Sequence, residues 1–139
     1  MKQDTANIPE ADPHDPIRPA RMLAIYAVIW LACGGVALLA HLAAAPRYID
    51  TPTRVVGGIA NLLGPWARPV ADGWPNAGKP PHEPSAFIGF VVLVLAAGVI
   101  LGSLKADSRW AQHFFIAAFV PLAALWIGIG FLELMVCAS

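Results

Sequence analysis

His41, His82 and Glu133 are the side chains of this sequence whose types and positions could support chemistry. His41 and Glu133 stand inside long apolar runs, and His82 stands just ahead of another. An ionisable group inside a bilayer is costly and is therefore a functional candidate. Two imidazoles and a carboxylate also form one class of iron site, but their separation here has none of the specificity of an HExxH motif. We therefore predict a cofactor-contacting corner made of these three residues, and no metal site.

The cofactor of this corner is left open by the sequence. A hydrogen-bonding or quinone-contacting role is one prediction, and contact with a haem or a pigment is another. A haem gripped between His41 and His113 is excluded, because these residues stand at opposite ends of their spans. His41 with His82 stays possible but places one ligand in a loop. The simpler alternative needs no cofactor: His41 reaches water or a backbone carbonyl, and Glu133 extends outward from its last helical turn.

Three apolar runs must position these residues. Hydrophobic residues make up 58% of the 139 residues and charged residues only 13%, against about 25% charged residues in an ordinary soluble domain. The runs cover residues 22–45, 85–104 and 114–136. At 1.5 Å per residue each is about 30 Å or longer, which matches the hydrocarbon core of a bilayer. The predicted fold class is an all-α integral membrane protein with three transmembrane helices and a short amphipathic interfacial helix.

The segments outside the spans differ in character. Residues 1–21 contain four prolines and four acids, and they are predicted to be a flexible polar tail because they cannot bury enough apolar surface to fold. Residues 46–84 form a long connection, and residues 105–113 form a short basic turn. The third span and the C-terminus occupy residues 114–139.

The interfacial helix is predicted at about 52–64, inside the long connection. Thr51 is expected to cap it, with Pro52 at its first position, and Gly64 with Pro65 should end it. One face of this helix is apolar. The opposite face, which includes Arg54, Gly57, Gly58 and Asn61, is polar but weakly charged. We therefore expect the helix to lie at the membrane surface or to cap the helix bundle.

Basic residues indicate the orientation of the spans. Arg18, Arg21, Lys105 and Arg109 lie close to the span ends on one side, whereas those on the other side are spread through the long connection. We predict a multi-pass protein of the cell inner membrane with its N-terminus in the cytoplasm and its C-terminus outside. The alternative is that the first run is a signal peptide cleaved after Ala45, although its apolar region is about twice the usual 7–15 residues.

Small residues beside large aromatic ones predict where the spans pack, because helix association in lipid depends on close contact. The first and third spans each carry such a residue seam, and the second span carries two glycines in the small-xxx-small spacing. The seam of the third span consists of Ile116, Phe119, Ala123, Trp126, Gly130, Glu133 and Cys137. The residues predicted to pack are Gly34, Ala37, Gly98, Gly102, Trp126 and Gly130.

Several function classes are excluded or favoured by this pattern. The nine Lys and Arg are scattered and the net charge is zero, which excludes nucleic-acid binding. No catalytic constellation is recognisable, so we expect no enzyme acting alone. The leading prediction is a small accessory or structural subunit of a multi-subunit inner-membrane complex, such as a respiratory or photosynthetic one. Its spans would contact lipid and other integral membrane subunits, and residues 46–84 would cover an extracytoplasmic protein.

Two alternatives come from other function classes. One is a self-assembling pore-forming or pilin-like secretion component. The other is a redox or lipid-modifying membrane protein that uses His41, His82 and Glu133.

Overall fold

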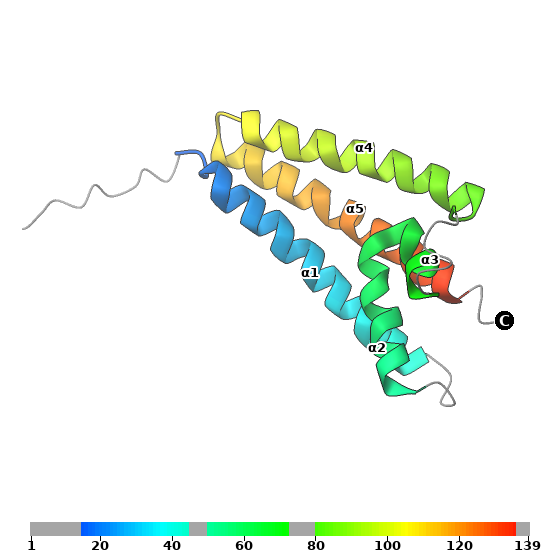
Figure 1. The fold of residues 1–139 in the computed structure, drawn as a ribbon. Helices are drawn as coiled ribbons and strands as arrows, with labels where there is room; N and C mark the ends of the chain where they lie inside the picture. The colour runs from blue at the N-terminus through cyan, green and yellow to red at the C-terminus, as the bar shows by residue number, and fades with distance from the viewer. Residues whose placement is uncertain (1–14, 45–49, 73–79, 136–139) are drawn as a thin grey trace, which may run out of the picture.

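Residues 15–44, 50–72 and 80–135 are described by the structure, a computed structural model (Figure 1). Three helices are long and apolar enough to cross a membrane: α1 (Pro19–Ala44), α4 (Glu83–Lys105) and α5 (Arg109–Met135). A shorter helix, α2 (Thr51–Ala60), lies between the first two. The predicted all-helical, three-span fold class is therefore confirmed, and the chain is a multi-pass membrane protein.

The three long helices lie side by side, with α1 and α5 running in one direction and α4 in the other (Figure 1). The turn end of the bundle holds the start of α1 and the short turn at residues 106–108, which is tighter than the predicted nine-residue turn because both flanking helices continue into polar residues. The connection end holds the last residues of α1 and α5 and the first of α4. Helix α4 packs mainly on α5 and only slightly on α1.

A small apolar core holds the turn end together. Met22 and Tyr26 of α1 are buried against Phe119 and Ala123 of α5. The rings of Tyr26 and Phe119 meet edge to face with their centroids 4.6 Å apart, a geometry that aromatic pairs favour. Two members of the predicted α5 seam thus contact α1 in this half of the bundle.

Gln112 ties the segment before α1 to the other two spans. Its side-chain oxygen accepts a hydrogen bond from the Ile17 backbone N–H at 2.6 Å, and its side-chain nitrogen donates to the Ser103 carbonyl at 3.4 Å. Gln112 is only 3% exposed, so these bonds satisfy polar groups that burial would otherwise leave without partners. The sequence pattern did not single out this residue.

The long connection folds back into the bundle. After α2 the chain forms a 3-10 helix, η1 (Asn61–Trp66), and then α3 (Ala67–Ala71). The predicted cap was wrong by one residue: Asp50 precedes α2, and its carboxylate accepts hydrogen bonds from the N–H and the hydroxyl of Thr53. A carboxylate at this position satisfies a free helical N–H and has the sign that the helix dipole favours.

Helix α2 presents its glycine face, not its apolar face, to the bundle. A Cβ added at Gly57 would lie 2.9 Å from the His41 ring, and one added at Gly58 would clash with a Leu38 methyl group. Farther along, Leu62 contacts Gly34 of α1. Gly34 is ten residues before the end of α1 at Ala44, so the connection runs back along α1 for about 15 Å. We call this part of the chain, residues 50–72, the re-entrant segment.

The connection breaks at Gly64, as the sequence predicted, although a helix resumes after it. Gly64 has φ 60° and ψ −124°, a conformation that only glycine adopts without strain. The indole N–H of Trp126 donates to the Leu62 carbonyl at 3.1 Å. Irregular backbone is tolerated at membrane depth only where protein covers it and satisfies its polar groups. Here α5 covers the break at Gly130 and Trp126 and satisfies the Leu62 carbonyl.

Candidate functional site: a polar pocket at the connection end

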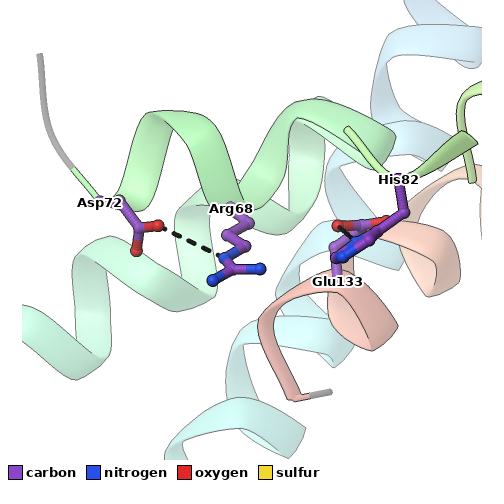
Figure 2. A network of polar contacts seen from close by, with 4 residues as sticks. All are labelled: Arg68, Asp72, His82 and Glu133. Atoms are coloured by element: carbon purple, nitrogen blue, oxygen red, sulfur yellow. Dashed lines mark hydrogen bonds and ion pairs between the residues drawn. The ribbon is translucent and has the colours of Figure 1, made fainter. Parts of the chain in front are cut away.

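Glu133, His82 and α3 meet at the connection end and form a polar pocket (Figure 2). Glu133 is in the last turn of α5, and His82 comes directly before α4. The break at Gly64 turns the chain so that α3 covers the third side. The pocket therefore depends on the re-entrant connection as well as on the spans.

Glu133 is a buried carboxylate, and its partner is the exposed imidazole of His82. The His82 Nδ1 and Glu133 Oε2 atoms are 3.0 Å apart, and the two side chains are 55% and 2% exposed respectively. The glutamate comes from inside the bundle and the histidine lies at its rim. A buried carboxylate without such a partner would be strongly unfavourable. Two of the three residues predicted to form a site are thus brought together.

Arg68 of α3 and Asp72, the residue directly after this helix, form a second pair. The Arg68 Nε lies 3.4 Å from a carboxylate oxygen of Asp72, and their side chains are 39% and 46% exposed. Water screens this pair, so it contributes little to stability. Figure 2 shows the Arg68 side chain between Asp72 and the His82–Glu133 pair. The sequence analysis singled out neither residue, although their i,i+4 spacing is typical of a helix.

The pocket has a volume of about 570 Å³, within the usual range for small-molecule sites. Its charged groups are three carboxylates, one guanidinium and one imidazole. Three prolines in its wall restrict the backbone there. Among the described residues no three His, Cys, Asp or Glu side chains are grouped so that they could hold a metal ion. The lining residues are Arg68, Pro69, Asp72, Pro80, Pro81, His82, Glu83 and Glu133.

His41, the third predicted site residue, does not line this pocket. Its ring lies against Gly57 and is edge to face with Phe131 at a centroid distance of 6.4 Å. Close by, Arg54 donates a hydrogen bond to the Leu42 carbonyl in the last turn of α1. A cation at this helix end satisfies a free carbonyl and suits the negative end of the helix dipole. His41 thus belongs to the junction between α1 and α2.

The residues predicted to pack behave differently from one another. Gly34 and Ala37 are buried, but Gly34 receives Leu62 of the connection rather than another span. Gly102 lies against Phe115 of α5, whereas Gly98 has nothing within 4 Å of an added Cβ.

On α5, Gly130 contacts the connection instead of a neighbouring span, since a Cβ added at Gly130 would lie 2.7 Å from the Asn61 carbonyl oxygen. Trp126 contacts both the connection, through its bond to the Leu62 carbonyl, and Trp30 of α1. These two residues of α5 therefore hold the re-entrant segment.

Comparison with known proteins assigns this chain to no family: no family model, curated protein or solved structure matches it. The features that bear on its function are therefore its own: three apolar spans, the re-entrant connection and the polar pocket.

Proposed function

We propose that this chain is a small integral-membrane subunit of a larger membrane assembly, in which α4 packs on a transmembrane helix of a neighbouring subunit. Gly98 carries this proposal. It lies in the middle of α4, is exposed, and has open space where a side chain would stand. Glycine in a helix interior costs about 1 kcal/mol relative to alanine, but it lets two helix backbones approach closely in lipid.

The position of α4 in the bundle supports the same proposal. Because α4 packs almost wholly on α5, most of its circumference is left without contacts inside the chain. Gly102, the other half of the small-xxx-small pair, is already used against Phe115. Gly98 is thus a notch in an otherwise bulky apolar face. The large exposed residues of that face are Phe87, Phe90, Val91, Val94, Leu95 and Leu101.

The assembly is tested by changing Gly98→Leu. We expect the unchanged chain to migrate in a multi-protein band after extraction in gentle detergent, and the variant to migrate in a smaller one, because the leucine blocks close approach. Ala32→Leu is the matched control, since Ala32 is an exposed small residue in the middle of α1. Native complex size in the Gly98→Leu variant would rule out the proposed contact. A ladder made of this chain alone would favour the self-assembly alternative.

A redox or lipid-modifying activity is the second candidate, and the buried Glu133 carboxylate favours it. Ionisable groups inside a membrane protein are functional candidates by default. Glu133→Gln removes the charge and keeps the size and hydrogen-bonding capacity of the side chain. We expect this variant to assemble normally if Glu133 only stabilises the pocket. Loss of an activity of the intact complex would assign the pocket a functional role.

A further inference from the structure

The charges of the polar pocket are unequal. Arg68 is paired with Asp72, and His82 is paired with Glu133. Glu83 also lines the pocket, and its carboxylate makes no ion pair with any residue that the structure describes. Counted over the lining residues that the structure describes, the wall therefore carries one negative charge in excess when His82 is protonated and two when it is neutral.

The surroundings of these carboxylates strengthen their pull on a cation. Glu133 is withdrawn from water, so its field is screened less than that of a surface group. Glu83 stands in the first turn of α4 and is exposed. The pocket thus offers one buried carboxylate and one that is open to water.

We propose that the polar pocket binds a cationic group, a primary ammonium or a guanidinium, with Glu83 as the carboxylate that accepts its hydrogen bonds. Charge-assisted hydrogen bonds of this kind are stronger than neutral ones. The bound cation stands close to Glu133 and offsets the excess negative charge of the wall. The group belongs either to a small organic cation or to a basic side chain of a neighbouring subunit, and in the second case the inference rests on the proposed function.

Binding is measured by titrating Nα-acetylargininamide (argininamide below), whose α-amino group is blocked, into the purified full-length chain in detergent, with isothermal calorimetry as the readout. Nα-acetylcitrullinamide (citrullinamide below), which has the same shape and carries no charge, is the matched control ligand. We expect argininamide to bind and citrullinamide to bind at least about tenfold more weakly, because only the guanidinium gains a charge–carboxylate contact at short range. Raising the salt concentration should weaken argininamide binding further.

Two variants locate the site. Glu83→Gln should weaken argininamide binding about threefold to tenfold and leave the His82–Glu133 pair in place. Asp107→Asn removes an exposed acid at the turn end and should change nothing. The assignment is overturned if citrullinamide binds as tightly as argininamide, if acetate competes with either ligand, or if both variants behave alike.

The test of cation binding is independent of the test of assembly, because the isolated chain needs no partner to bind argininamide. If native complexes lose a subunit on Glu83→Gln but keep it on Asp107→Asn, the cation is a side chain of that subunit. If argininamide binds and the Glu83→Gln complex keeps its size, the cation is a small molecule. Failure of argininamide binding overturns this inference and leaves the contact at Gly98 standing.

Discussion

Single side chains hold the broken connection in place, and Trp126 is the clearest case. Changing Trp126→Phe keeps an aromatic ring but removes the indole N–H that donates to the Leu62 carbonyl. Because that carbonyl lies in the covered break, we expect a loss of about 1 kcal/mol in unfolding free energy and faster amide exchange at 61–66. Trp30→Phe is the control, since Trp30 contacts the Trp126 ring at 6.4 Å without a hydrogen bond to the connection among the described residues. Equal exchange rates in the two variants would contradict this role.

Asp50 gives α2 a stability that depends on pH. Hydrogen bonds from the Thr53 side chain and backbone hold the pKa of Asp50 below its ordinary value. A carboxyl group with a lowered folded-state pKa stabilises the fold above its ordinary pKa, and this contribution is lost as pH falls through the folded-state value. We expect the protection factors of the α2 amides, which are exchange rates corrected for the intrinsic effect of pH, to fall in that acidic range. Asp50→Ala should show low protection factors at all pH values, and the hypothesis fails if the protection factors of the unchanged chain and this variant have the same pH profile.

At the scale of elements, substitutions at two glycines of α5 are expected to have opposite effects on stability. A Cβ at Gly130 would lie 2.7 and 3.0 Å from the carbonyl oxygens of Asn61 and Gly64. Both oxygens belong to the backbone of η1, so relieving the contact would shift that element against α5. Gly130→Ala should therefore cost about 1–3 kcal/mol. Gly128 has open space, so Gly128→Ala should be neutral or stabilise the helix by up to about 1 kcal/mol. Thermal unfolding in detergent compares the two, and equal melting temperatures would show that the connection does not pack on α5 as described.

The elements also show what the sequence could predict. Length and hydropathy are local properties, so the three spans and the break at Gly64 could be found without any tertiary information. The packing of α2 could not, because an amphipathic pattern says which face is apolar but not whether that face meets lipid or protein. Gly57 and Gly58, taken as part of a polar face, are the contact surface, while Val56 and Ile59 are exposed.

The candidate site was predictable only in part, for a related reason. His82 and Glu133 lie at span ends, and topology alone brings span ends of the same side to one depth. Arg68 lines the pocket because the connection folds back into the bundle. This fold depends on contacts with α1 and α5, which no local sequence pattern contains. His41 lies at the connection end of α1, but it is separated from the pocket because α2 packs against it.

At the scale of the whole molecule, the bundle has two different halves. The turn end is a small apolar core tied together by Gln112. The connection end is opened by the inserted segment and holds the charged side chains of the pocket. Close packing at the first end fixes the spans, so the second end can hold a polar pocket without its spans separating. A ligand from the water would therefore reach the polar pocket from the connection end of the bundle.

Because α4 is long and apolar enough to cross a membrane, we expect its two ends to face opposite sides. Glu83→Cys and Asp107→Cys place a thiol just inside the start of α4 and just past its end, at exposed positions, in a background without the two native cysteines. Basic residues such as Lys105 favour the cytoplasmic side, so a membrane-impermeant maleimide added to intact cells should label Glu83→Cys and not Asp107→Cys. Permeabilised cells should label both. The reverse labelling pattern would show that the predicted orientation is inverted and that the pocket faces the cytoplasm. Labelling of both thiols in intact cells would contradict the assignment of α4 as a membrane span.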